Sequence, residues 1–387
     1  GIYMRNIGAT MARPPPGQPY ARSGRWINMN GNLMISEIVS ISYSNITKKW
    51  YASTNIGGII AETSNDSAIQ ISSAGNIKGA DIDVINNISS LPDSTGKFTA
   101  ESDSNETPFS NVITTQQNLD KIYLYKFNET SENYIKKTEL SNLKNILTDK
   151  STVITPIVSN KYKLNSIIVG TTDGIYEVNN LGQANEISQK ILYSEVPDSE
   201  EVNMHSILYG TSEDPDLILV GIGNKLYMRE INSTVLNRLN PETALGLDNL
   251  QDISGVAINT YNSNHIVVSV GNHYENNAIN TDIIYTPNKG LNWYSLKAGF
   301  NFSNIKRVMI IGDETADKFS SIIVVVDETD VYATSTDNID FNDINSSVRW
   351  FNLGTDGLPD FNISDIIYDN KDDVLYLSMY GLSLIHI

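Results

Sequence analysis

The feature that most constrains this chain is a pair of short apolar runs, separated by a turn, that recurs along the sequence. The first run of each pair is apolar on both faces, which is typical of a strand covered on both sides. The second run alternates more and often contains Gly-Ile-Tyr or a similar triplet, which is typical of a half-exposed strand. The pairs are residues 50–54 with 57–59, 167–171 with 174–176, 217–221 with 225–227, 266–269 with 283–285, and 322–326 with 331–332, followed by the single run 375–378 and a weaker copy at 121–125. Self-similarity of this kind predicts a repeat architecture.

The spacing of the pairs indicates what is repeated. The second runs recur about every 50 to 60 residues, which is too long for most two-helix solenoid units. Another strand-like run precedes the first run, as at residues 37–41 and 364–368. Three or four strands per repeat, with almost no helical periodicity, predict an all-β protein. We expect a β-propeller of about seven blades (six to eight), each a three- to four-stranded antiparallel sheet.

The repeat also suggests how the chain is divided. We assign residues 26–381 to the propeller and residues 1–25 to a strand of a preceding blade plus a Pro-rich connection. The strand that begins Gly1-Ile2-Tyr3 and the last repeat have three possible placements: adjacent blades, one closing blade or separate propellers. Residues 382–387 break the pattern, and we interpret them as an artefactual tail.

Composition excludes several classes of site and partner. The 387 residues include no cysteine, which excludes disulfides, zinc–thiolate centres and cysteine nucleophiles. The net charge of -18 repels nucleic acid phosphates and anionic lipid headgroups. No apolar stretch is long enough to span a bilayer. We therefore expect a monomer without cofactor, metal, nucleic acid partner or membrane insertion.

One segment carries a family resemblance. Residues 286–293 read Thr-Pro-Asn-Lys-Gly-Leu-Asn-Trp, which resembles the Asp-box, Ser-x-Asp-x-Gly-x-x-Trp, of sialidase-type (BNR-repeat) propellers. The matching positions are Thr286, Asn288, Gly290 and Trp293, and a second, interrupted copy has Ser335, Asp337 and Trp350. In that family the box is structural: its acid binds turn amides, its glycine permits the turn, and its tryptophan packs between blades. The resemblance therefore implies a fold and not an activity.

The last repeat resembles a second group within the same superfamily. Residues 357–359, 366–369 and 375–381 are similar to the end of a blade in sortilin-like and xyloglucanase-like propellers. The resemblance extends over residues 26–381 and is strongest toward the C-terminal end. It implies a propeller whose function can be catalytic or purely binding.

A segment near the start bears on catalysis. Residues 51–59 resemble the Tyr-Ala-Arg-Thr-Asp-Ile-Gly-Gly segment of xyloglucanases, in which the Asp is a catalytic carboxylate. Here Asn55 stands at that position, and Ser53 replaces the Arg. An amide cannot exchange the catalytic proton as a carboxyl group does. The resemblance then implies a hydrolase relative that has lost one acid, whereas the simpler interpretation is a turn made by Gly57 and Gly58.

Other candidate residues carry weaker signals. The four histidines are His205, His265, His273 and His386, and we expect surface or turn positions rather than metal or catalytic-triad roles. Asp337, Asp340 and Asp343 form an acidic loop, but their spacing is not that of an EF-hand. We predict a solvated loop rather than a calcium site.

Three functions remain open at this level. Because no catalytic residue can be assigned, we favour a non-catalytic, exported or cell-surface propeller that binds a protein or glycan. The alternative is a glycoside hydrolase of the xyloglucanase-like type acting on β-glucans. A third possibility is an assembly factor, like the propellers that help to build photosystems, for which the sequence offers no evidence in either direction.

Overall fold

The described part of the chain consists mainly of strands and their connections. The computed structural model describes residues 2–6, 27–28, 38–44, 49–54, 58–62, 68–70, 79–85, 109–116, 121–128, 133–139, 157–160, 162–163, 166–171, 174–181, 187–193, 204–247, 250, 252–271, 281–312, 321–327, 330–354, 363–369 and 373–379. The tail at residues 382–387 and the Pro-rich connection within residues 7–25 lie outside the described residues.

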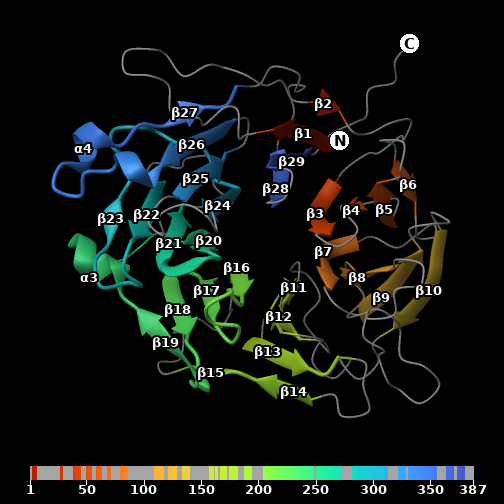
Figure 1. The fold of residues 1–387 in the computed structure, drawn as a ribbon. Coiled ribbons are helices and arrows are strands. Elements are labelled where there is room, and N and C mark those ends of the chain that lie inside the picture. The colour runs from red at the N-terminus through yellow and green to blue at the C-terminus, as the bar shows by residue number, and fades with distance from the viewer. Residues whose placement is uncertain are drawn as a thin grey trace. The chain divides into compact units, whose positions relative to one another are not determined.

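The chain divides into two compact units. Unit 1 comprises Gly1–Thr155, Gly182–Ala184 and Leu353–Ile387, and unit 2 comprises Pro156–Leu181 and Asn185–Asn352. In both units the described strands pair antiparallel with one exception. The described residues also form two short α-helices, α3 (Pro241–Leu245) and α4 (Ile344–Ser347) (Figure 1).

Among its described residues, unit 1 forms three four-stranded sheets. The first has the order β2-β1-β29-β28, with β1 (Ile2–Asn6), β2 (Ile27–Asn28), β28 (Ile363–Asp369) and β29 (Val374–Met379). The second contains β3 (Ile38–Ser44), β4 (Lys49–Thr54), β5 (Gly58–Glu62) and β6 (Ala68–Gln70) in chain order. The third contains β7 (Gly79–Ile85), β8 (Phe109–Gln116), β9 (Lys121–Asn128) and β10 (Asn133–Glu139), also in chain order.

The first of these sheets joins distant parts of the sequence. Strand β1 lies between β2 and β29, and its register pairs Ile2 with Ser378 and Asn6 with Val374. The strand that begins the sequence therefore shares a sheet with the last repeat, which is one of the three placements that the sequence left open.

Unit 2 has four sheets among its described residues. Three of them are four-stranded and run in chain order. The first contains β11 (Ile157–Ser159), β12 (Ile167–Thr171), β13 (Gly174–Asn179) and β14 (Ile187–Lys190), and the second contains β20 (Ile253–Asn259), β21 (Asn262–Val270), β22 (Asp282–Thr286) and β23 (Tyr294–Ser295). The third contains β24 (Arg307–Gly312), β25 (Ser321–Val326), β26 (Val331–Ser335) and β27 (Phe351–Asn352). The remaining sheet has the order β15-β19-β18-β17-β16, with β15 (Leu192–Tyr193), β16 (Met204–Tyr209), β17 (Ile218–Ile222), β18 (Lys225–Arg229) and β19 (Val235–Leu239). Strand β15 is the exception to antiparallel pairing, because it adds to β19 in parallel.

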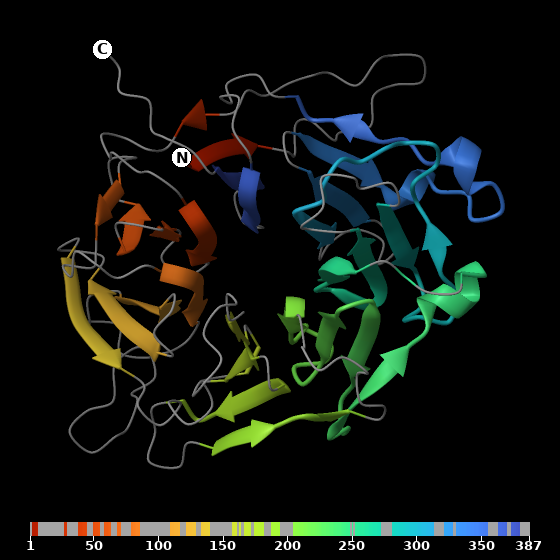
Figure 2. The same ribbon diagram turned by 180° about the vertical axis from the view of Figure 1, so that it is seen from behind.

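Within each unit, neighbouring sheets meet through their first strands. In unit 1, β3 contacts both β28 and β7, and in unit 2, β16 contacts β11 and β20, while β20 contacts β24. Seen from behind in Figure 2, the strands of each unit 2 sheet follow one another outward from these first strands. This is how adjacent blades pack in a propeller.

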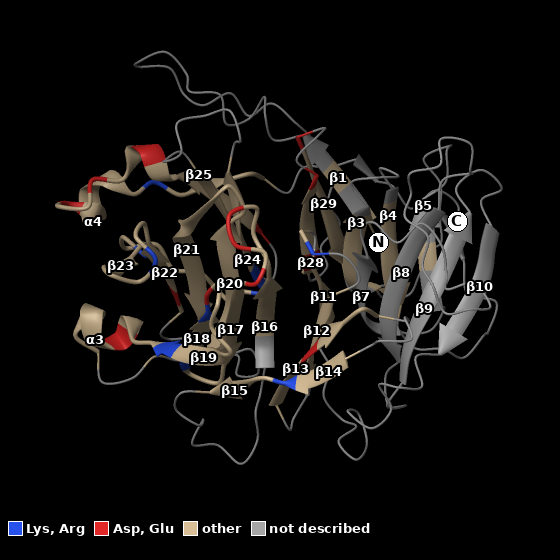
Figure 3. Cartoon of the chain, turned by 60° about the horizontal axis from the view of Figure 1, so that its bottom comes forward, with Lys and Arg blue, Asp and Glu red and all other residues tan. Residues whose placement is uncertain are grey.

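The strands form where the apolar runs predicted them, because their side chains are buried on both faces. All five residues of β17 are buried, as are all six of β29. One apolar cluster of unit 2 includes Leu219 from β17 together with Val256 and Ile266 from the next sheet, so the core lies between sheets. Figure 3 shows β17 and β21 without charged residues.

A polar contact between first strands recurs in both units. In each case, a residue directly after a β-bulge in the first strand of one sheet uses its side chain as an acceptor. It accepts a hydrogen bond from a backbone amide in the first strand of the next sheet. Val256 donates its amide to Ser206 Oγ over 3.1 Å, and Ile41 donates to Asp365 Oδ2 over 3.2 Å. Asp365 is buried, so the amides of Ile41 and Ile366 and the hydroxyl of Ser40 satisfy its carboxylate.

Candidate functional site

The turn between β22 and β23 contains the first Asp-box-like segment. Thr286 ends β22, and its hydroxyl oxygen accepts the backbone amides of Asn288 (3.3 Å) and Gly290 (2.9 Å). The same hydroxyl donates to Asn288 Oδ1 over 3.0 Å, and that oxygen also accepts the amide of Asn292 over 2.8 Å. The two side chains therefore satisfy the backbone amides of the turn, as an Asx turn does.

Glycine and tryptophan have separate roles in this turn. Gly290 adopts a φ of 90°, a left-handed conformation in which a side chain would be strained. Trp293 is 5% exposed and packs in the apolar cluster shared with the preceding sheet. These contacts shape the turn and the core, and Lys289 of the same segment adds an ion pair with Glu230 over 2.6 Å.

The second, interrupted segment occupies the corresponding connection between β26 and β27. Ser335 ends β26, and its Oγ accepts the amide of Asp337 over 3.3 Å at the start of a short 3-10 helix, η2 (Thr336–Asn338). Trp350 directly precedes β27, and its Nε1 donates to the carbonyl of Leu296 over 2.9 Å. Both segments thus join a third strand to a fourth, while their assignment to the Asp-box family remains a prediction.

The position that resembles a hydrolase acid follows β4. Ser53 and Thr54 are buried at the end of β4, and β5 begins at Gly58. Asn55 itself lies outside the described residues. The predicted strands before and after Asn55 are confirmed by β4 and β5, and the role of Asn55 remains a prediction.

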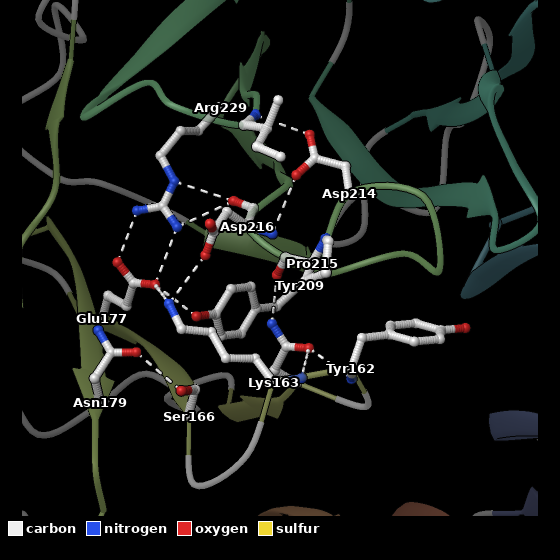
Figure 4. Close-up of polar contacts among 12 residues, drawn as sticks. Tyr162, Lys163, Ser166, Glu177, Asn179, Tyr209, Asp214, Pro215, Asp216 and Arg229 are labelled. Atoms are coloured by element: carbon white, nitrogen blue, oxygen red, sulfur yellow. Dashed lines mark hydrogen bonds and ion pairs between the residues drawn. The ribbon is translucent and has the colours of Figure 1, made fainter.

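The structure brings together a charged cluster that we did not predict from the sequence. Glu177 on β13 receives two hydrogen bonds from the guanidinium of Arg229 on β18, at 2.7 Å and 3.0 Å (Figure 4). The hydroxyl of Tyr209, at the end of β16, donates to Glu177 Oε1 over 2.5 Å. Glu177 and Arg229 are 8% and 6% exposed, so this fork-like pair joins two neighbouring sheets within unit 2.

More exposed groups surround this buried pair. Lys163 Nζ lies 2.9 Å from Asp216 Oδ1 and 3.6 Å from Glu177 Oε1. The guanidinium of Arg229 also donates to the carbonyl of Asp216. Two cations therefore face two carboxylates, and the cluster is nearly neutral as a whole.

The electrostatics of the cluster do not suit acid–base chemistry. Burial alone would raise the pKa of Glu177, but hydrogen bonds from Arg229 and Tyr209 and the charges of Arg229 and Lys163 outweigh it and lower the pKa to about 2. Burial and the neighbouring carboxylate raise the pKa of Tyr209. Glu177 therefore stays ionised and Tyr209 stays protonated near neutral pH, so neither group is suited to exchange a proton with a substrate. Their hydrogen bonds instead connect β13 to the next sheet.

Asp282 differs from Glu177 in this respect. It is half-buried at the start of β22, where its carboxylate accepts the hydroxyl of Ser295 over 2.7 Å and the amide of Ile283 over 2.7 Å. Burial raises the pKa of Asp282, and the hydrogen bonds offset this only in part. A raised pKa is what a proton-donating carboxyl group requires.

The histidine at position 265 is not where we expected it. His265 lies within β21 and is 2% exposed, so the predicted surface or turn position is wrong for this residue. Its Nδ1 lies 2.8 Å from the hydroxyl of Tyr285, and burial lowers its pKa. His205 lies in β16, whereas His273 and His386 fall outside the described residues.

The acidic loop has the solvated character that its spacing predicted. Asp337, Asp340 and Asp343 are exposed. Asp340 accepts the backbone and side-chain amides of Asn342, and Asp343 accepts the hydroxyl of Ser346. No group of three metal-ligating side chains occurs in the described part of the chain. No helix among the described residues is long and apolar enough to cross a membrane.

Comparison with known proteins informs the fold. No protein-family model matches the sequence, and no curated protein matches it. The fold resembles that of an ancestral GH74 enzyme. The TM-score is 0.59 at 12% sequence identity, over 92% of this chain and 45% of that enzyme. A GH74 enzyme from Niastella koreensis gives a TM-score of 0.45 at 13% identity, over 88% of this chain and 57% of that enzyme.

The similarity to the ancestral enzyme supports a coarse conclusion about the fold. GH74 enzymes are β-propellers, so the antiparallel sheets and near absence of helix among the described residues fit the expected propeller-like class. The chain spans less than half the length of the ancestral enzyme. Blade number, ring closure and the sortilin-like assignment remain predictions.

Sequence reasoning overlooked the charged cluster, although a signal was present. Glu177 follows Gly-Ile-Tyr, and Arg229 follows Leu-Tyr-Met, so each charge extends an apolar run. A charge inside a run that is otherwise buried needs a partner. The two opposite charges in neighbouring repeats were therefore candidates for one another.

Proposed function

We propose that the protein is a glycoside hydrolase of the xyloglucanase-like type that acts on β-glucans. The observation that carries this proposal is the similarity of the fold to an ancestral GH74 enzyme over nearly the whole of this chain. The segment at residues 51–59 supports it, because its resemblance to the xyloglucanase segment falls on the connection between β4 and β5.

The amide side chain of Asn55 constrains the proposed hydrolysis, because it stands where the xyloglucanase segment has an acid. If Asn55 replaces a catalytic acid, hydrolysis needs another carboxyl group. Burial raises the pKa of Asp282, and Asp282 begins a third strand, as Gly58 does in its own sheet. We therefore expect Asp282→Asn to lower any hydrolysis.

The test is an assay of reducing ends released from xyloglucan. The unmodified chain should release sugar slowly, and Asn55→Asp should raise the rate by about a hundredfold. Asn224→Asp is the matched control, because Asn224 lies in the turn between β17 and β18, which joins a second strand to a third as the Asn55 connection does. Absence of hydrolysis by both the unmodified chain and Asn55→Asp would rule out the hydrolase proposal.

A second candidate is a non-catalytic propeller, exported or at the cell surface, that binds a glycan or protein. Asn55 and Ser53 favour it, since both differ from the residues of the xyloglucanase segment. Binding of xyloglucan on an affinity gel without any release of sugar would support this candidate over the first.

A further inference from the structure

A short segment crosses from one sheet of unit 2 to the next. Its first part, Ile187–Lys190, is β14, the last strand of its sheet, and its second part, Leu192–Tyr193, is β15, the last strand of the neighbouring sheet. In Figure 1, β14 and β15 lie one after the other at the bottom of the view. We call residues 187–193 the strap. One continuous segment therefore lies along the outer edges of two sheets.

The strap is attached to its first sheet mainly through the backbone. The register pairs β14 with β13, beginning with Ile187 opposite Asn179. All four residues of β14 are exposed, so their side chains bury little apolar area. Ile191 follows and donates its amide to the carbonyl of Ile175 over 2.9 Å. A strand that is held by backbone hydrogen bonds close to solvent opens at a lower free energy than a strand in the core.

Two side chains anchor the strap in the core between the two sheets. Ile191 is 3% exposed and belongs to an apolar cluster that includes Leu236 of the neighbouring sheet. Tyr193 packs against the same cluster, with its ring edge-on to that of Tyr227 at 5.4 Å. Between these two anchors, Leu192 is 63% exposed. Strand β15 contributes two residue pairs with β19, both parallel, and parallel pairing is slightly less stable per residue than antiparallel pairing. The attachment therefore depends largely on two side chains.

The two sheets are also joined by contacts in which the strap takes no part. Glu177 on β13 pairs with Arg229 on β18, and Asn160 Nδ2 donates to the carbonyl of Pro215 over 2.6 Å. Asn160 directly follows β11, and Pro215 lies between β16 and β17. Because these contacts do not use residues 187–193, they hold the two sheets together when the strap is detached.

We propose that the strap is a latch, which detaches from both sheets while the sheets themselves stay folded and joined. Detachment uncovers Leu236 and the outer edge of β19, where backbone groups then become able to pair with another extended segment. The strap thereby controls access to this edge and to the core between the two sheets.

The test is thiol labelling of the full chain, which is clean because the sequence has no cysteine. Ile191→Cys places a thiol on the buried side of the strap, and Val220→Cys places one in β17, within the same apolar cluster. If the strap opens by itself, Ile191→Cys should react at least about a hundredfold faster than Val220→Cys. Its rate should also depend weakly on urea, because opening a short segment exposes little surface, whereas the rate for Val220→Cys should rise steeply.

A matched pair of substitutions tests the anchor. Tyr193→Ala should speed the labelling of Ile191→Cys about tenfold, because the ring contact with Tyr227 is lost. It should leave the labelling of Val220→Cys within about twofold, since the sheets stay folded. Leu192→Ala is the control, because Leu192 lies in the same strand with its side chain exposed, and it should change neither rate.

Hydrogen exchange of the unmodified chain covers the case in which Ile191→Cys itself loosens the strap. The amide of Ile191 should exchange faster than the amides of β17, and its rate should be insensitive to low concentrations of urea. Equal labelling rates with the same urea dependence, exchange of the strap only together with β17, or equal effects of Tyr193→Ala and Leu192→Ala would overturn the latch. These measurements do not involve hydrolysis, so they leave the proposed function to its own test.

Discussion

Two sheets of unit 2 place very different side chains at the same position of the third strand. Glu177 on β13 pairs with Ile168, and Tyr285 on β22 pairs with Val267, each four residues into its strand. Glu177 is held by Arg229 and Tyr209 from the next sheet, whereas Tyr285 stacks on Phe341 from a loop of the next sheet. The fold therefore specifies that this position is buried against a neighbouring sheet, and the local partners decide whether charge or an aromatic ring occupies it.

The two positions also differ in the free-energy cost of burying their side chains. A buried ion pair is costly to desolvate and becomes strongly unfavourable when one partner is lost. An aromatic contact carries no such penalty, and its contribution comes from buried area and ring geometry. The two positions should thus respond differently to substitution and to pH.

The largest effect should come from removing one charge of the pair. Arg229→Ala leaves the Glu177 carboxylate buried without its guanidinium, which should lower the free energy of unfolding by about 3–5 kcal/mol. Urea unfolding followed by fluorescence would measure it. The double variant Glu177→Leu with Arg229→Met should recover most of the loss, and failure to do so would show that packing rather than charge dominates.

Acid should destabilise the charged position over a defined pH window. The pKa of Glu177 is lowered from 4.5 to about 2 on folding, so its contribution is complete above the unfolded pKa and is lost as pH falls toward 2. The loss should amount to about 3 kcal/mol between pH 5 and pH 1. Unfolding free energies measured across that range should show the decrease, and Glu177→Gln should flatten it.

A matched pair of hydroxyl deletions sharpens the comparison. Tyr209→Phe removes a donor to an ionised carboxylate and should cost about 1.5–3 kcal/mol, whereas Tyr285→Phe removes a neutral partner of His265 and should cost about 0.5–1.5 kcal/mol. Both variants keep the aromatic ring and remove only a hydroxyl group, so the difference between their costs reflects the hydrogen-bond partner rather than ring packing. Equal costs measured by urea unfolding would contradict the distinction between the two positions.

The smallest effect concerns the aromatic position. Burial lowers the pKa of His265 in the folded state, so the unfolded chain binds more protons and stability falls as pH drops below about 6.5. The slope should not exceed about 1.4 kcal/mol per pH unit, and it should disappear in His265→Gln. A slope between pH 6.5 and 5 that persists in the variant would assign the effect to another group.

Much of the fold follows from local sequence. Strands β12, β17, β21, β25 and β29 overlap the predicted apolar runs. A short run that is apolar on both faces is typical of a strand covered on both sides, so its position can be read from the sequence. The turn at Thr286 also follows from its residues, since hydroxyl, amide and glycine satisfy backbone groups only a few positions away.

The candidate sites depended on contacts between distant residues. The pairing of β1 with β29 joins strands at opposite ends of the sequence, and no local pattern selects one strand edge over another of similar composition. Glu177 and Arg229 were each visible as a charge in an apolar run, but their contact depends on how two sheets pack. Which of the many tyrosines is exposed depends on the same packing, since Tyr162 and Tyr261 follow the same Asn-x-Tyr pattern and differ in burial. Sequence alone therefore determined the strands and turns, where interactions are local, and the tertiary structure decided the partners, because only packing brings distant side chains within bonding distance.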